Sequence, residues 1–329
     1  MKSEQNLAIE RAVAILARGG LVAFPTETVY GLGAAAGNPQ AVRRVFAVKR
    51  RPAAHPLIVH ISNSSELGRV AREVPRVAER LAARFWPGPL TLILPRGSEV
   101  PLEVTGGQET VAVRVPNHPL ALALLAEFGA GIAAPSANRF GAVSPTRAEH
   151  VRTDLGSDVD LVLDGGPCAV GLESTIVDVS RGAARLLRPG GVAVEAIEAE
   201  LGERLQLAAD TSVRAPGQLE SHYATRAKIM LATPAELVAR TAALSEAGAK
   251  VAVLAPIGTE VPSVATSILV PAHASGYAHL LYESLRELDS RGVDAILVVA
   301  PDTEGLGLAV VDRLSRAAAP RPGDTREER

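Results

Sequence analysis

Apolar residues recur along the first two-thirds of the chain with helical spacing, and short unbroken apolar runs separate these stretches. Residues 7–18 place their apolar side chains on one helical stripe that ends at Gly19-Gly20, and the run LVAF (21–24) that follows is typical of a buried strand. Many strands mixed with helices indicate an α/β or α+β architecture. The pattern predicts helices over 7–18, 39–48, 65–85 and 118–128, and strands within 21–24, 56–61, 89–95, 110–116, 131–138, 159–166 and 174–180.

The periodicity fades between residues 206 and 227, where small polar residues, Pro and Gly dominate. Beyond this stretch the pattern predicts helices over 234–247, 276–290 and 305–318, and strands over 251–256, 267–270 and 295–300. Strands that alternate with helices predict a small parallel sheet covered on its faces. The expected organisation is an N-terminal domain over 1–205, a linker over 206–227, a C-terminal domain over 228–319 and a flexible tail over 320–329.

Composition and charge narrow the class of protein. The 329 residues suffice for about two domains, and 47% apolar against 21% charged residues excludes a disordered or collagen-like chain. A formal net charge of −2 and 3% aromatic residues argue against nucleic-acid binding as the main activity, because phosphate contacts and base stacking are both undersupplied. No apolar run approaches the ~18 residues of a membrane span. The beginning of the chain also lacks the core of a signal peptide, so we expect a soluble, cytoplasmic protein.

A stretch rich in hydroxyls and glycines, PTETVYGLG (25–33), follows the first predicted strand. Within it, GLGAAAG (31–37) comes close to a dinucleotide-binding fingerprint, but its third glycine is one place late. No GxxxxGK[ST] phosphate loop occurs in the sequence. Two interpretations stay open for this stretch: a strand-to-helix loop with satisfied hydroxyls, or part of a binding site.

Three cations and two histidines follow in KRRPAAHPLIVH (49–60). Adjacent cations at the mouth of a strand suit a polyanion such as a triphosphate, whereas a solvated basic turn is the structural alternative. His55 and His60 are five residues apart, which does not match the spacing of a helical metal pair. We interpret His60 as a satisfied core histidine. The single cysteine, Cys168, excludes a disulfide framework and is interpreted as a small core residue.

Arg114 lies inside VAVRV, where strand alternation turns it away from Val113 and Val115. An arginine among such residues needs an anionic partner or solvent at the strand end. Further polar residues lie near other predicted strands: Ser136, Asn138, Ser144 and Thr146, then Ser174 and Thr175, then Arg188. No GxSxG motif indicates a serine hydrolase. With Lys49 and Arg51, these residues suit a nucleotide triphosphate and a second anion, held by charge neutralisation without covalent catalysis.

Taken in order, the motifs PTETVYGLG, KxRP followed by PLIVH, FWPGPLT, TVAVRVP, APSANRFGAVSPT, ESTIVD and LRPG resemble those of the threonylcarbamoyl-AMP synthase family. They cover about residues 10–195 almost without a gap. Residues 206–329 resemble the linker and extra domain of the two-domain form of this family, and APGQLESHYAT keeps its PG and HYA elements. The resemblance implies a YrdC-like N-terminal α/β domain with a twisted mixed sheet, and a smaller Rossmann-like C-terminal domain with a parallel sheet.

The resemblance also implies an activity. Members of this family are nucleotidyltransferases that condense L-threonine, bicarbonate and ATP to L-threonylcarbamoyladenylate and release pyrophosphate, with Mg²⁺ as the accompanying ion. The product feeds the threonylcarbamoyl modification of adenosine 37 in tRNA. This implies that the product passes to the tRNA threonylcarbamoyl transferase machinery, with at most a weak direct contact to tRNA and none to a membrane.

Site residues are carried over by their positions in the matching motifs. Those expected to contact threonine or its carbamate are Thr28, His60, Arg114, Ala134 and Ser174. Those expected to bind ATP are Lys49, Arg51, His55, Thr110, Ser136, Asn138, Ser144, Arg188, His222 and Tyr223. Of these, Lys49, Arg51 and Arg188 would act in catalysis by neutralising the converging negative charges. The linker, with Pro216, Gly217, His222 and Tyr223, would cover the site as a lid and protect a short-lived carbamate from water.

Two other functions are weighed against this one. A carbamoyl transferase that forms carbamoyl-adenylate would share the N-terminal domain, but it needs a partner domain for which the sequence offers no candidate region. An RNA-binding module is disfavoured by the near-neutral charge and the few aromatic residues. For the C-terminal domain, regulation, support of the lid and partner binding are all compatible with the sequence.

Overall fold

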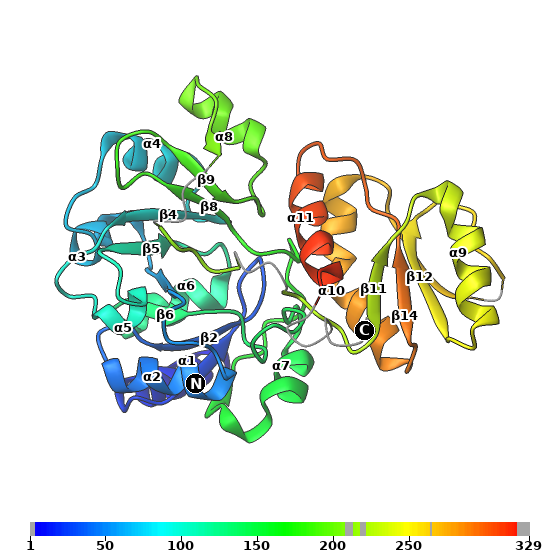
Figure 1. Cartoon of the computed structure of the whole chain (residues 1–329). Coiled ribbons are helices and arrows are strands. Elements are labelled where there is room, and N and C mark those ends of the chain that lie inside the picture. The colour runs from blue at the N-terminus through cyan, green and yellow to red at the C-terminus, as the bar shows by residue number, and fades with distance from the viewer. Residues whose placement is uncertain (1–3, 208–212, 218–221, 264, 321–329) are drawn as a thin grey trace, which may run out of the picture. The chain divides into compact units, whose positions relative to one another are not determined.

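The computed structural model describes residues 4–207, 213–217, 222–263 and 265–320, which form two compact units (Figure 1). The first unit comprises Met1–Phe140 and Ser144–Gln218, and the second comprises Gly141–Val143 and Leu219–Arg329. The first unit thus continues past residue 205, where the linker was expected to begin. The second unit takes three residues from within the predicted N-terminal domain. Apart from Pro320, the predicted tail lies outside the described residues.

The first unit is built on one mixed sheet. Its strands are β1 (Val22–Phe24), β2 (Gly31–Ala35), β3 (Ile58–His60), β4 (Leu90–Pro95), β5 (Thr110–Arg114), β6 (Ile132–Ala134), β7 (Leu161–Val162), β8 (Thr175–Asp178), β9 (Arg185–Arg188) and β10 (Gln206–Leu207). Their order in the sheet is β10-β9-β8-β4-β5-β3-β6-β2-β1-β7. The pairs β3–β5 and β4–β8 are parallel, whereas β4–β5 and β3–β6 are antiparallel. The mixed sheet that the motifs implied is therefore confirmed.

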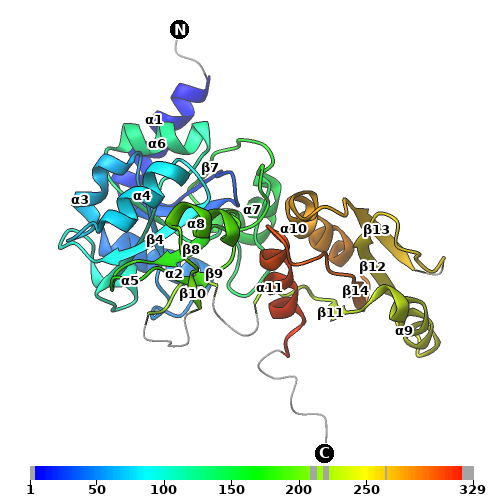
Figure 2. The same ribbon diagram turned by 90° about the horizontal axis from the view of Figure 1, so that it is seen from above.

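Helices and 3₁₀ turns connect these strands. They are α1 (Glu4–Ala17), α2 (Pro39–Lys49), η1 (Ser64–Glu66), α3 (Leu67–Val70), α4 (Arg76–Phe85), α5 (Leu102–Thr105), α6 (Pro119–Phe128), α7 (Ala148–Leu155), η2 (Gly156–Asp158) and α8 (Val194–Leu201). The Asn38 side chain caps α2 by accepting from the backbone N–H groups of Gln40 and Ala41. Helix α1 packs against α6 (Figure 2).

The two faces of the sheet are covered differently. On one face, alternate strand residues pack with α2, α3 and α4 in the main apolar core. On the other face, the residues between them form a smaller apolar cluster with two residues of the predicted linker. This cluster contains Ile58, Ile93, Ala112, Ile176, Leu187, Val213 and Ala215. Because strand side chains alternate between faces, polar residues in register with this cluster lie on the second face.

Two segments differ from the sequence pattern. The helix expected over 65–85 is divided into η1, α3 and α4, because Pro75 has a fixed backbone angle and lacks an N–H group, and therefore starts a new helix. The stretch 31–35, close to a dinucleotide fingerprint, is the buried strand β2 and not a loop. A Cβ atom on Gly33 would lie 2.8 Å from the Phe24 ring, so glycine is needed there for packing against β1.

The second unit contains a four-stranded parallel sheet in the order β11-β14-β12-β13. Its elements are β11 (Lys228–Leu231), α9 (Pro234–Glu246), β12 (Val251–Pro256), β13 (Thr266–Val270), α10 (Ala274–Ser290), β14 (Ala295–Val298) and α11 (Gly307–Ala318). Figure 1 shows α9 on one face of this sheet and α10 with α11 on the other. The predicted parallel sheet is confirmed, and β11 is a strand that the sequence pattern did not indicate. In the described parts of both units, every helix is too short or too polar to cross a membrane.

Candidate active site

Four polar side chains lie among the smaller apolar cluster on the second face of the large sheet. His60 and Arg114 are register partners on the parallel neighbours β3 and β5. Thr91 of β4 and Ser174, which precedes β8, are on the same face, with their hydroxyl oxygens 2.7 Å apart. All four side chains are buried. The sheet thus brings together three of the residues expected at threonine.

Glu27, in the loop between β1 and β2, supplies the anionic partner that the strand pattern required for Arg114. The Arg114 Nη2 atom lies 2.7 Å from the Glu27 Oε2 atom, and the two side chains are 4% and 7% exposed. Arg114 Nη1 donates to Thr28 Oγ1 at 2.9 Å, and Nε donates to the Gly88 carbonyl at 3.2 Å. The Thr28 hydroxyl is in turn 2.8 Å from that of Thr26, so the loop is held as a unit against β5.

This group keeps hydrogen-bonding capacity that the protein does not use. Both carboxylate oxygens of Glu27, Nη2 of Arg114 and Nδ1 of His60 are buried without a hydrogen-bond partner among the described residues. The contact between Glu27 and Arg114 is therefore a close ion pair that lacks hydrogen-bond alignment. The expectation of a satisfied core histidine is wrong for this nitrogen of His60. Buried polar atoms are almost always paired, so four exceptions on three neighbouring residues mark a place for a polar ligand.

His60 makes stability depend on pH. Burial and the adjacent Arg114 guanidinium lower the pKa of His60 to about 3, from about 6.5 for a free side chain. Between these values the unfolded chain binds a proton that the folded protein excludes, so the free energy of unfolding falls as pH drops below 6.5. The His60 contribution approaches about 1.4 kcal/mol per pH unit.

Urea denaturation of the wild type and of His60→Asn between pH 7 and pH 4.5 tests this expectation. In the variant, the free energy of unfolding should change less steeply with pH, by an amount that corresponds to about one proton fewer taken up on unfolding. His55 and His118, whose pKa values are also lowered by burial, contribute in both proteins. Equal slopes in the two proteins would contradict a buried neutral His60.

Lys49, at the end of α2, is buried and joins two predicted ATP-binding segments. Its Nζ atom donates to the carbonyl oxygens of Ser136, at 2.6 Å, and of Asn138. Burial and the nearby Arg51 guanidinium lower the pKa of Lys49. The Phe140 N–H group donates to the Lys49 carbonyl at 2.9 Å. The lysine therefore fixes the 136–140 segment to the end of α2.

Arg51 and His55 both lie near the Phe140 ring. The Arg51 guanidinium lies 5.5 Å from the centroid of the Phe140 ring, and the His55 ring lies 5.5 Å from the same centroid. Arg51 also donates to the Pro56 carbonyl at 3.1 Å. Lys49 and Arg51 are 1% and 8% exposed, so the alternative of a solvated basic turn does not hold for them.

Arg188, at the end of β9, connects Ser174 to the predicted linker. Its Nη2 and Nε atoms donate to the Ser174 carbonyl at 2.8 and 3.2 Å, and Nη1 donates to the Pro216 carbonyl at 2.9 Å. Nearby, the Ser144 hydroxyl donates to Glu173 Oε1 at 2.6 Å. A further predicted residue, Ser144, is thereby held beside the segment that carries Ser174.

Residues 213–217 of the predicted linker lie on the same sheet face. Val213 and Ala215 are buried in the smaller apolar cluster. Between them, the Arg214 N–H group donates to Gln108 Oε1 at 2.7 Å, and Gln108 Nε2 donates back to the Arg214 carbonyl at 3.1 Å. With the bond from Arg188 to Pro216, these contacts attach the segment along its length.

The other predicted residues occupy several places. Ala134 ends β6 and is buried. Thr110 begins β5 on the same face as Arg114, but four residues from it, a separation of about 13 Å along a strand. His222 and Tyr223 belong to the second unit, where the Tyr223 ring stacks on Tyr282 with centroids 5.5 Å apart. Their expected role at ATP stays a prediction.

Three residues that the sequence reasoning missed take part in this arrangement: Glu27, Thr91 and Glu173. The sequence could have indicated Glu27, because this carboxylate lies within the hydroxyl-rich stretch PTETVYGLG, directly before the predicted Thr28. For Glu173, the signal was the acid directly before Ser174. For Thr91, it was the last position of the motif FWPGPLT. Cys168 is a buried core residue, as expected, and burial together with the Glu27 charge raises its pKa to about 12.

No cluster of three or more His, Cys, Asp or Glu side chains that could hold a metal ion occurs among the described residues. The two carboxylates of the site, Glu27 and Glu173, contact Arg114 and Ser144 instead. These residues do not fit a Mg²⁺ site built by the protein alone.

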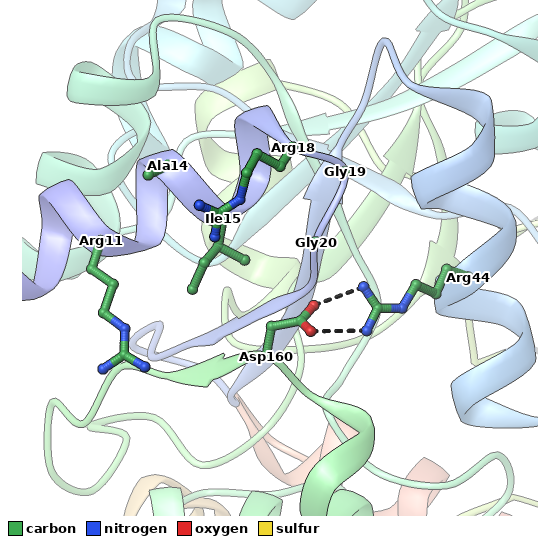
Figure 3. A pocket seen from close by; sticks show the side chains of 8 residues that line it. All are labelled: Arg11, Ala14, Ile15, Arg18, Gly19, Gly20, Arg44 and Asp160. Atoms are coloured by element: carbon green, nitrogen blue, oxygen red, sulfur yellow. Dashed lines mark hydrogen bonds and ion pairs between the residues drawn. The ribbon is translucent and has the colours of Figure 1, made fainter.

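A polar pocket of about 430 Å³ lies at the turn between α1 and β1. Arg11, Arg18 and Arg44 line it together with Asp160, and Figure 3 shows the double contact between Arg44 and Asp160, at 2.8 and 2.9 Å. The Leu21 N–H group also donates to Asp160. None of the predicted site residues lines this pocket, so it is separate from the candidate active site.

Comparison with known proteins identifies both parts of the chain. Residues 14–190 match the family model described as "Telomere recombination", and residues 192–319 match the one described as "Threonylcarbamoyl-AMP synthase, C-terminal domain". The chain is 43% identical to the threonylcarbamoyl-AMP synthase of Pyrococcus abyssi, over 95% of this chain and 94% of that protein. It is 42% identical to the threonylcarbamoyl-AMP synthase of Bacillus subtilis, over 97% and 95%.

A solved structure extends the match to three dimensions. The crystal structure of P. abyssi Sua5 complexed with L-threonine has a TM-score of 0.89 and 42% identity, covering 97% of this chain and 96% of that one. The resemblance read from the motifs, the two-domain α/β fold and the assignment as a synthase are thereby confirmed. The chain belongs to the threonylcarbamoyl-AMP synthase family.

Proposed function

We propose that this protein makes L-threonylcarbamoyladenylate from L-threonine, bicarbonate and ATP, with release of pyrophosphate. The observation that carries the proposal is the buried group of Glu27, His60 and Arg114, whose unused donor and acceptors suit a small zwitterion such as an amino acid. Its position on the sheet matches the residues expected at threonine. The L-threonine bound to the related P. abyssi protein supports the same choice of ligand.

The cations of the site divide between two substrates in this proposal. Arg114, with His60 and Ser174, receives threonine or its carbamate. Lys49 and Arg51, beside the 136–140 segment, receive ATP with Arg188. The carbamate oxygen attacks the α-phosphorus, the bond to the β-phosphate breaks and pyrophosphate leaves. Several negative charges converge in this step, so positioned guanidinium groups can lower its barrier without a protein nucleophile.

The segment 213–217 supports the proposed lid. It lies on the sheet face that carries Arg114, and Arg188 and Gln108 bond to it. A cover at this place would shield the carbamate from water. Roles for His222 and Tyr223 in the lid, and for Thr110 at ATP, belong to the same proposal.

Three further properties stay predictions. Mg²⁺, carried on the triphosphate, would offset negative charge there. The product would pass to the machinery that modifies tRNA, and the protein would act in the cytoplasm.

Pyrophosphate release tests the proposed reaction. The full-length protein is given ATP, Mg²⁺ and bicarbonate, with L-threonine, with L-serine or with no amino acid. We expect release that requires both bicarbonate and threonine and that is lower with serine. Release that is absent, or indifferent to threonine, would contradict the proposal and leave carbamoyl transfer or binding as the activity.

A further inference from the structure

Threonine reaches the protein as a zwitterion, and its α-ammonium group must lose a proton before the nitrogen can bond to carbon. We propose that the Glu27 carboxylate receives this ammonium group and takes its proton, which makes Glu27 a catalytic residue. The inference rests on the proposed function, because it assigns a role in the threonine half of that reaction.

The Glu27 side chain has hydrogen-bonding capacity that the protein does not use. A buried carboxylate normally accepts several hydrogen bonds. Both oxygens of Glu27 are buried, and neither accepts a hydrogen bond within the part of the chain that the structure describes. The loop around Glu27 is well anchored, since the Val170 N–H group donates to the Glu27 carbonyl at 2.7 Å. The vacant acceptors are therefore held in place on a fixed backbone.

The spacing of the opposite charges of Glu27 and Arg114 suits an α-amino acid. In an α-amino acid, the nitrogen and the carboxyl carbon are separated by about 2.5 Å. The protein offers the complementary pair at a similar spacing, because Arg114 Nη2, which also lacks a hydrogen bond, is 2.7 Å from Glu27 Oε2. The substrate carboxylate can therefore bond to Arg114 while its ammonium group bonds to Glu27.

The other titratable groups around Glu27 are poor acceptors for this proton. Arg114 is a permanent cation. The pKa of Cys168 is raised to about 12, so its thiol keeps its proton. Burial lowers the pKa values of His60 and His118, so neither ring holds a proton well at neutral pH. His118 Nδ1 in addition accepts from the Leu120 N–H group.

The ammonium group gives one proton to the Glu27 carboxylate and becomes an amine. The amine nitrogen then bonds to the bicarbonate carbon, the carbon–hydroxyl bond breaks, and the departing hydroxide takes a second proton from the nitrogen to form water. The products are N-carboxythreonine, water and neutral Glu27, which later returns its proton to solvent.

The pH dependence of Glu27→Gln tests this role. The amide keeps the shape of the side chain but cannot take the proton. At pH 7 we expect kcat/KM for threonine, measured by pyrophosphate release, to fall by about 10²- to 10⁴-fold. Between pH 7 and pH 9 the residual value should rise about tenfold per pH unit, because solvent then supplies the free amine. The wild type should stay nearly flat over this range.

Two further variants make the result specific. Glu103→Gln removes a surface carboxylate that pairs with Arg43, and it should behave as the wild type. Glu27→Asp keeps a carboxylate base, so its kcat/KM for threonine should stay nearly constant between pH 7 and pH 9, even if the rate is lower. This variant also tests the role of Glu27 if the Gln variant does not fold. The role of Glu27 would be overturned if kcat/KM of Glu27→Gln depended on pH as that of the wild type does. It would also be overturned if kcat/KM of Glu27→Asp rose tenfold per pH unit. Failure of the proposed function is distinct, since the wild type would then show no threonine-dependent release at any pH.

Discussion

Replacing Arg114 by Met is expected to abolish threonine-dependent synthesis and to lower the free energy of unfolding by about 3–5 kcal/mol. The reason is the Glu27 carboxylate, which is 7% exposed and lies 2.7 Å from the Arg114 guanidinium. Without the arginine, a buried negative charge has no counter-charge. The loss also removes the bonds that Arg114 donates to Thr28 and Gly88. Urea denaturation measures the stability, and pyrophosphate release measures the synthesis.

A double-mutant cycle separates the charge from the packing. When Glu27→Gln is combined with Arg114→Met, neither buried charge is left unpaired, so the double variant should lose less stability than the two single losses added together. We expect a coupling energy of about 1–3 kcal/mol. Additive losses from the two substitutions would contradict the buried ion pair. Activity should not return in the double variant, since the cation for the substrate carboxylate is still missing.

Replacing Arg188 by Met is expected to lower kcat for pyrophosphate release by about 10²- to 10³-fold. The proposed reaction gathers negative charge at the α-phosphorus, and Arg188 is one of the cations that offset it. The same guanidinium bonds to the carbonyls of Ser174 and Pro216, so stability should also fall, by about 1–3 kcal/mol. A rate within twofold of the wild type would exclude Arg188 from the charge clamp.

Arg185→Met is the matched control for this prediction. Arg185 is in the same strand, three residues earlier, and pairs at 2.6 Å with Asp178, which is fully buried. Its loss should reduce stability at least as much as the loss of Arg188, because a buried carboxylate then lacks its partner. The kcat of the folded protein should nevertheless stay near that of the wild type. If both variants lose kcat equally, the Arg188 effect is structural.

The strand pattern was a reliable guide to which way a side chain points. Alternation in VAVRV placed Arg114 opposite Val113 and Val115, and the structure buries those two valines in the main core. The same pattern required an anionic partner or solvent near Arg114, but it did not identify which residue would be the partner. The anion is Glu27, which is 87 positions away and on a loop between two other strands. Spacing along the chain carries no information on such a partner.

The basic stretch 49–60 shows where local reasoning was undecided. A triphosphate site and a solvated turn predict the same residues, because both place cations near a strand. The choice depends on burial, and burial depends on segments far along the chain. Lys49 is buried where the carbonyls of Ser136 and Asn138 accept from it, and Arg51 is buried beside the Phe140 ring.

The sequence by itself determined the family and most elements, because these follow from motifs in a fixed order and from local periodicity. It also determined the parallel sheet of the second unit, since strands and helices alternate there. Tertiary structure alone decided that His60, Arg114 and Ser174 share one face with Thr91, and that Glu27 completes them. The reason is the strand order β8-β4-β5-β3, which joins segments from distant parts of the chain. Such pairings are fixed by long-range packing, and a one-dimensional pattern of apolar and polar residues does not specify them.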